Sequence, residues 1–112
     1  MALLAVTLAA CQTAGPPQLR YEGVSVMDGV EHPLTLSVSR RGDRLVGDYY
    51  VAAAKGSFDG VVAGTAVTAE LKPGPSCTYA FAGTLTATTL TGAFEPAACP
   101  GGQTGTWELE LR

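Results

Sequence analysis

Phe81-Ala82-Gly83-Thr84-Leu85 is the stretch that decides the fold, because a glycine and two large apolar residues lie on the same face of one strand. Glycine inside a strand weakens it, so a strand that keeps such glycines has a steric reason for them. The pattern recurs elsewhere, at Leu45-Val46-Gly47-Asp48-Tyr49, Phe58-Asp59-Gly60-Val61-Val62 and Leu90-Thr91-Gly92-Ala93-Phe94, and Gly105-Thr106-Trp107 keeps its second half. A small barrel has this steric demand, because its narrow interior takes alternating small and large residues.

Apolar and polar residues alternate around these patterns. Every second residue is apolar over residues 34–39, 67–71 and 107–111, as in a strand with one buried face. Turn residues separate the runs, at Asp28-Gly29, Arg41-Gly42-Asp43, Pro73-Gly74 and Gly101-Gly102. About eight strands are predicted, near residues 19–27, 33–40, 44–51, 56–63, 65–72, 77–84, 89–95 and 104–111. The prediction is an all-β, antiparallel up-and-down meander that closes as a small barrel, with a β-sandwich as the alternative.

This repeated spacing of glycine and large apolar residues resembles that of the meander barrels of the lipocalin-like and avidin-like families. The resemblance concerns architecture, and none of the binding residues of those families matches a position here. Side chains alternate between the two faces of a strand, so aromatic residues an even number of positions from these glycines point inward with them, at Tyr49, Phe58, Tyr79, Phe81, Phe94 and Trp107. They form the core or, in a wider barrel, line a cavity for a small apolar ligand, for which Tyr79, Phe81 and Trp107 are the candidate residues. Tyr21 and Tyr50 are expected on the outer surface.

The amino-terminal segment indicates export. An apolar run from Ala2 ends in Leu8-Ala9-Ala10-Cys11, which resembles the lipobox of bacterial lipoproteins. The resemblance implies that Cys11 is acylated and that residues 1–10 are removed as a signal peptide. The short Pro-containing piece that follows predicts a tether over residues 11–17, and the remaining length predicts a single domain at 18–112. No Lys or Arg precedes the run, so we expect translation to start upstream of Met1. The alternative is an apolar strand or short helix with Cys11 as a buried thiol.

The cysteine count agrees with export. With Cys11 assigned to lipid, the remaining two of the three cysteines, Cys77 and Cys99, are predicted to form a disulfide. A metal site is not expected, because the single histidine, His32, lies far in sequence from both thiols. No cofactor is predicted.

Composition and motifs point away from catalysis and nucleic acid. A net charge of −3 with 15% charged residues lacks the basic clusters that bind phosphate backbones. No G-x-S-x-G motif or phosphate-binding loop occurs in the sequence. Asp48 and Asp59 are expected to face solvent. His32 is expected in a solvated turn or at the start of a strand.

The expected function is therefore non-enzymatic. We expect a binding or structural protein of the bacterial cell envelope, anchored by lipid to the outer membrane and facing the periplasm or the surface. Two roles remain open: a barrel that binds a small apolar ligand, and an inhibitor or assembly accessory that binds another envelope protein.

Overall fold

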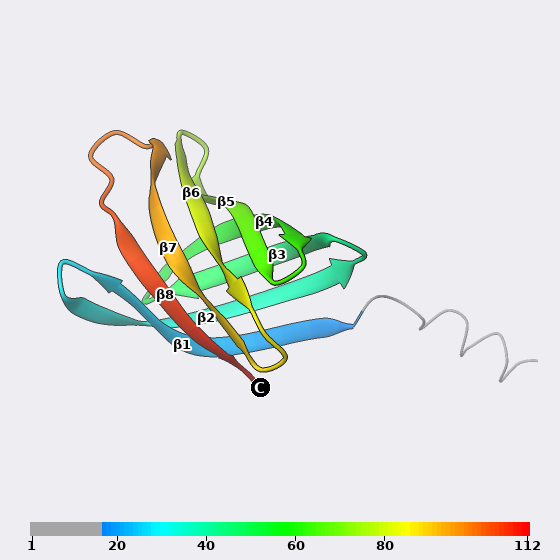
Figure 1. The fold of residues 1–112 in the computed structure, drawn as a ribbon. Helices are drawn as coiled ribbons and strands as arrows, with labels where there is room; N and C mark the ends of the chain where they lie inside the picture. The colour runs from blue at the N-terminus through cyan, green and yellow to red at the C-terminus, as the bar shows by residue number, and fades with distance from the viewer. Residues whose placement is uncertain (1–16) are drawn as a thin grey trace, which may run out of the picture.

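The computed structural model describes residues 17–112, which form a closed antiparallel barrel (Figure 1). In this range the chain has eight strands: β1 (Gln18–Met27), β2 (Val30–Arg41), β3 (Arg44–Val51), β4 (Ala54–Ala63), β5 (Ala66–Gly74), β6 (Cys77–Leu85), β7 (Thr89–Ala98) and β8 (Gly105–Leu111). Each strand pairs with its neighbours in sequence, and the order is β1-β2-β3-β4-β5-β6-β7-β8. The predicted all-β meander is confirmed, and the sandwich alternative is wrong.

Pairing between the first and last strands closes the sheet. β1 and β8 are antiparallel from Tyr21 opposite Leu111 to Val26 opposite Thr106. Closure leaves no edge strand with unpaired backbone groups. The hydrogen-bonded sheet is therefore complete within residues 18–111.

Two of the predicted turns occur where the local sequence places them, and the one at Pro73-Gly74 does not. Asp28 and Gly29 have φ angles of 52° and 73°, the left-handed pair that a tight β-hairpin turn requires. Arg41 pairs with Arg44 at the end of β2, so the turn is Gly42-Asp43, within the predicted stretch Arg41-Gly42-Asp43. Pro73-Gly74, predicted as a turn, instead belongs to β5, where the pairing with β6 shifts register between Leu71 and Gly74. The irregular register accommodates a proline that cannot donate a backbone hydrogen bond.

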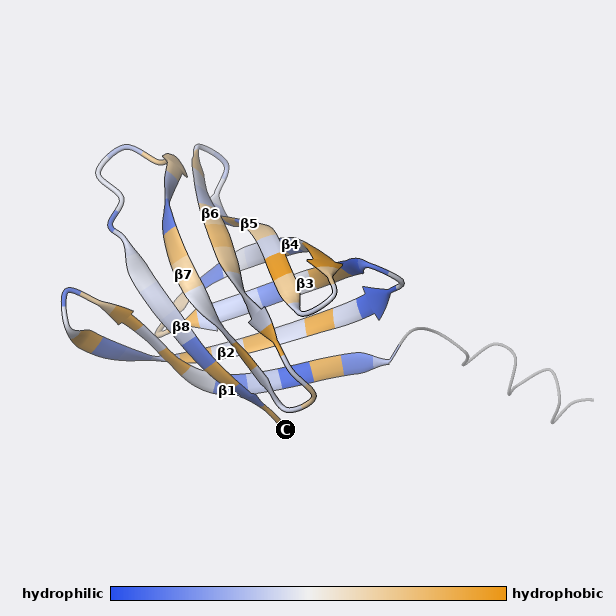
Figure 2. Ribbon diagram, in the orientation of Figure 1, coloured by the Kyte–Doolittle hydropathy of each residue, from blue (hydrophilic) through white to orange (hydrophobic). Residues whose placement is uncertain are grey.

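Hydropathy alternates along the strands (Figure 2), and glycines lie against large side chains inside the barrel. Gly47 lies opposite Phe58, and Gly92 lies opposite Trp107. A Cβ atom added to Gly92 would lie 2.6 Å from Cζ of Phe81, and one added to Gly105 would lie 2.5 Å from Cζ of Phe94. The inward glycines therefore make room for aromatic rings, as the repeated sequence pattern predicts.

The two tyrosines expected on the outside behave differently. Tyr50 is 44% exposed, which confirms that prediction. Tyr21 is only 3% exposed, so the prediction for Tyr21 is wrong. It points inward between Leu36 of β2 and Leu111 of β8, on the same face of β1 as Gly23. The β1 segment carries the same aromatic-x-Gly spacing, but it ends in Ser25 in place of a large apolar residue.

The up-and-down order gives the barrel two different ends. One end holds the start of β1 at Gln18, the end of β8, and the turns β2–β3, β4–β5 and β6–β7. We call it the tether end. The other end holds the turns β1–β2, β3–β4 and β5–β6 and the longer β7–β8 loop over residues 99–104, and we call it the mouth end (Figure 1). No helix in the described part of the chain is long and apolar enough to cross a membrane.

Candidate functional site

The interior is filled around Trp107. Its ring centroid lies 5.2 Å from that of Tyr49 and 5.1 Å from that of Phe81, and Phe58 stacks on it at 6.1 Å. Between this cluster and the tether end, the inward side chains are almost completely buried, at Leu36, Val38, Leu45, Val67, Leu90 and Leu109. Burying each such side chain stabilises the fold by roughly 1.5–3 kcal/mol. This half of the barrel is a solid core.

The mouth half is hollow. A cavity of about 300 Å³ opens there, lined by Ser25, Met27, His32, Tyr49, Val51, Ala54, Leu71, Pro73, Tyr79, Phe94 and Trp107. These residues come from all eight described strands, from the parts that lie toward the mouth end. The rings of Tyr79 and Phe94 meet edge to face, with centroids 5.6 Å apart. The cavity is therefore an apolar, largely aromatic cup above the Trp107 cluster.

A few polar groups face into this cup. Ser25 of β1 and His32 of β2 are directly opposite each other, and Ser25 is also opposite Trp107 of β8. The other walls carry the phenols of Tyr49 and Tyr79. Burial, and to a smaller extent the neighbouring Tyr79, raises the pKa of Tyr49 to about 12. The Tyr49 phenol therefore keeps its proton throughout the physiological range.

A disulfide fixes the rim of the cavity. Cys77 at the start of β6 and Cys99 in the β7–β8 loop are joined, with Cα atoms 4.2 Å apart. The backbone N–H of Gly102 donates to the carbonyl of Cys99 at 3.0 Å. Gly102 also lies against the Tyr79 hydroxyl, since a Cβ added there would be 2.7 Å from that oxygen. The bridge therefore holds the β7–β8 loop beside a cavity-lining residue.

The structure separates the three aromatic residues proposed for ligand binding. Tyr79 and Trp107 line the mouth cavity, whereas Phe81 does not and packs beneath them against Trp107 and Phe58. Ser25 was missed by sequence reasoning, because a serine in a strand is ordinarily a solvent-facing residue. The Gly23-x-Ser25 spacing on the inward face of β1 is the signal that could have found it.

His32 is the third residue of β2, so it lies near the start of a strand, as one of the two alternatives predicted. The alternative of a solvated turn is wrong, because its half-buried side chain lines the cavity. β2 continues through Pro33, whose carbonyl accepts a hydrogen bond from the backbone N–H of Ala52. Asp59 agrees with its prediction, since it forms an exposed ion pair with Arg44. Cys11 lies outside the described residues.

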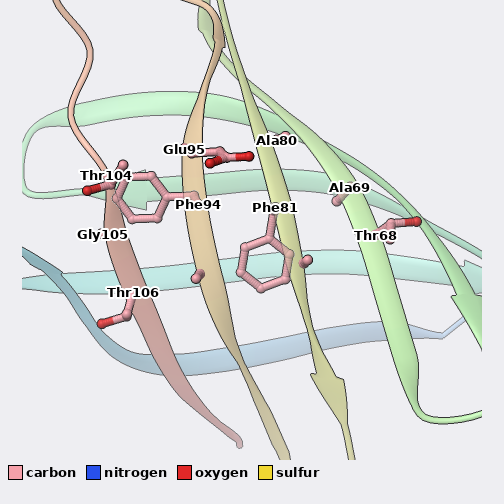
Figure 3. A pocket seen from close by; sticks show the side chains of 11 residues that line it. Thr68, Ala69, Ala80, Phe81, Phe94, Glu95, Thr104, Gly105 and Thr106 are labelled. Carbon is pink, nitrogen blue, oxygen red and sulfur yellow. The ribbon is translucent and has the colours of Figure 1, made fainter.

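A second hollow lies on the outer wall of the barrel over β5–β8 (Figure 3). It measures about 690 Å³. The outward side chains along it are small and uncharged apart from Glu95, namely Thr68, Ala80, Ala82, Ala93, Thr104 and Thr106. The hollow exists because the short side chains of alanine and threonine cover little of the outer face of the curved sheet.

Within residues 17–112 no group of three or more His, Cys, Asp or Glu side chains could hold a metal ion. Comparison of the chain with protein-family models, with curated proteins and with solved structures finds no match. The class that the geometry itself defines is a small up-and-down β-barrel, solid at one end and cupped at the other.

Proposed function

We propose that this chain is a non-enzymatic protein of the bacterial cell envelope, anchored by lipid on Cys11, whose barrel binds a small apolar molecule in the mouth cavity. The observation that carries the proposal is the aromatic cup of about 300 Å³ above an otherwise solid core. Concave, mostly apolar sites with a few convergent polar groups are typical of small-molecule binding. The resemblance of the repeated glycine spacing to that of lipocalin-like and avidin-like barrels supports the same role.

The position of the first strand supports the anchoring. β1 starts at Gln18 at the tether end, opposite the mouth. A lipid on Cys11, joined by a short Pro-containing tether, would hold the solid end near the membrane and leave the cavity facing the aqueous phase. The Cys77–Cys99 bridge supports an oxidising compartment outside the cytosol.

Binding at the mouth can be tested by filling it. Ala54 lines the cavity at the start of β4, so Ala54→Phe places a ring in it. Ala63 lies at the other end of the same strand and is exposed, so Ala63→Phe is the matched control. We expect Ala54→Phe to abolish binding of an apolar fluorescent probe and Ala63→Phe to retain it. Equal binding by both variants would place the site elsewhere.

Anchoring is tested by membrane fractionation of cells that express the exported chain. Cys11→Ser removes the thiol that would carry the lipid, so the variant is expected to leave the membrane fraction. If the variant still sediments with membranes, the lipid anchor is wrong.

The hollow over β5–β8 favours a second candidate function, contact with another envelope protein. Its volume of about 690 Å³ and its small, exposed side chains leave room for a partner segment against the wall. Ala82 and Ala93 are paired neighbours on the outer face, and an arginine at either position would obstruct it. This function predicts that Ala82→Arg removes a cross-linked partner in whole cells, while Ala54→Phe leaves the cross-link intact.

A further inference from the structure

The mouth cavity has features that select a ligand by its chemistry, and this inference rests on the ligand-binding function proposed above. Its floor and one side are aromatic. Trp107 is held by Tyr49 at a ring-centroid distance of 5.2 Å, and Phe94 by Tyr79 at 5.6 Å, both in edge-to-face geometry. Rings fixed in this way offer flat, rigid surfaces on which another ring stacks or meets edge to face.

The opposite wall is polar. Ser25 and His32 are an opposed pair on β1 and β2, a position in which Cβ atoms of antiparallel strands are about 4.5–5.5 Å apart. Ser25 is 1% exposed, and the half-buried His32 is the more accessible of the two. Imidazole and hydroxyl groups both donate and accept hydrogen bonds. Because Ser25 is also opposite Trp107, this wall stands directly beside the aromatic floor.

The lining holds no group of permanent charge, since none of its residues is Asp, Glu, Lys or Arg. A charged ligand that enters such a site loses water without gaining an ion pair, which weakens its binding. The volume, about 300 Å³, is at the lower end of the range for ligand pockets, so the occupant is small.

We propose that the mouth cavity binds an uncharged, flat aromatic molecule of one or two rings with a hydrogen-bonding group at one edge, its ring against Trp107 and Phe94 and its polar edge at His32 and Ser25. The aromatic floor sets the shape of the ligand. The polar wall sets its orientation, and a lining without Asp, Glu, Lys or Arg disfavours carboxylates and ammonium ions.

Four naphthalene derivatives test the inference at neutral pH: 2-naphthol, naphthalene, 2-naphthoate and 2-naphthylmethylammonium. The sample is the full chain carrying Cys11→Ser, labelled with ¹⁵N, because the single tryptophan gives one indole N–H signal from Trp107 at the floor of the cavity. We expect 2-naphthol to bind about fivefold tighter than naphthalene, as one hydrogen bond would give, and about tenfold or more tighter than either charged compound.

The polar wall is tested by His32→Leu, which removes the accessible hydrogen-bonding group at similar volume. We expect the variant to lose its preference for 2-naphthol over naphthalene while it still binds naphthalene. Glu31→Gln changes the adjacent, exposed residue of β2 and should leave the preference intact. The ratio of the affinities for 2-naphthol and naphthalene reports recognition of the polar edge, because a general loss of stability would lower both affinities together.

The outcomes separate the two proposals. Binding of a charged derivative or of naphthalene as tight as that of 2-naphthol overturns the inference, although the mouth remains a binding site. A preference for 2-naphthol that survives His32→Leu overturns the role of the polar wall. Failure of all four compounds to shift the Trp107 signal overturns both the inference and the ligand-binding function.

Discussion

Gly92 lies on β7 between Gly83 of β6 and Trp107 of β8, and the space left by its missing side chain is occupied by the Phe81 ring. A Cβ at this position would also lie 2.5 Å from the backbone oxygen of Ala82 and 2.7 Å from Cα of Gly83. Backbone atoms cannot rotate away as the end of a flexible side chain can. The repeated glycines are therefore packing residues of the core as much as the aromatic rings are.

Gly92→Ala is expected to destabilise the barrel by about 2–3 kcal/mol, because overpacking forces the sheet or the Phe81 ring to move. Gly74→Ala is the matched control, since an added Cβ there has nothing within 4 Å. Its effect should stay within about 0.5 kcal/mol. Urea denaturation gives both values, and equal stabilities of the two variants would refute the packing role of Gly92.

Tyr49 makes the fold sensitive to alkaline pH. Burial raises its pKa from the ordinary value of 10.0 to about 12 in the folded state, so the unfolded chain loses this proton first. The contribution is complete below pH 10 and is lost as pH rises through 12, on the order of 2 kcal/mol. Tyr49→Phe has no such proton, so its stability should fall less between these pH values. Parallel stability curves for the two proteins would contradict the shift.

At the scale of elements, the β7–β8 loop is the longest connection between the described strands, and the Cys77–Cys99 bridge ties it to the start of β6. Neither cysteine lies in the solid core, which is built from inward residues nearer the tether end. The bridge therefore holds the β7–β8 loop at the rim of the mouth in the folded state and restricts the conformations of the unfolded chain. The closure of the sheet between β1 and β8 does not involve it.

The bridge closes a loop with a sequence separation of 22, so its loss is expected to cost about 3 kcal/mol through the entropy of the unfolded chain. Replacing both cysteines, as Cys77→Ala with Cys99→Ala, should lower the urea midpoint and leave the far-ultraviolet circular dichroism spectrum of the barrel unchanged. Dithiothreitol should destabilise the parent chain and have no effect on the double variant. An unchanged midpoint in the double variant would show that the bridge does not constrain the unfolded state.

The strands themselves could be predicted from the sequence, because period-two alternation and turn residues are local signals. β3 begins and ends where it was predicted, whereas β2 begins at Val30, before its predicted start at Pro33. Pairing with β1 extends the strand there, with Val24 opposite Pro33 and Met27 opposite Val30. Likewise, β5 extends through Pro73 to Gly74 because β6 pairs with it across a register shift.

At the scale of the whole molecule, the alternation of side chains along a strand predicts which face a residue lies on but not how deep it lies in the barrel. Tyr79 and Phe81 share a face of β6, yet Tyr79 lines the cavity and Phe81 is 2% exposed in the solid core. Depth depends on how all the strands are staggered around the barrel. The cavity as a whole therefore could not be located from sequence, although two of its aromatic residues were predicted.

The difference between the two ends would give a molecule with the proposed lipid anchor a direction. Gln18 and Arg112 both lie at the tether end, and Trp107 lies at the floor of the mouth cavity. With lipid on Cys11 as proposed, the solid end faces the bilayer and the cavity opens away from it. Ligand would then enter from the aqueous phase and would not pass directly from the membrane into the cup.

Lipids with brominated acyl chains, which quench tryptophan only at close range, test this orientation. We expect the fluorescence of Trp107, the single tryptophan, to be the same in brominated and ordinary vesicles that carry the lipidated chain. A control chain with Trp107→Phe and Gln18→Trp carries its tryptophan at the tether end and should be quenched, since it lies nearest the anchor. Quenching of Trp107 with no quenching in the control would mean that the mouth faces the bilayer.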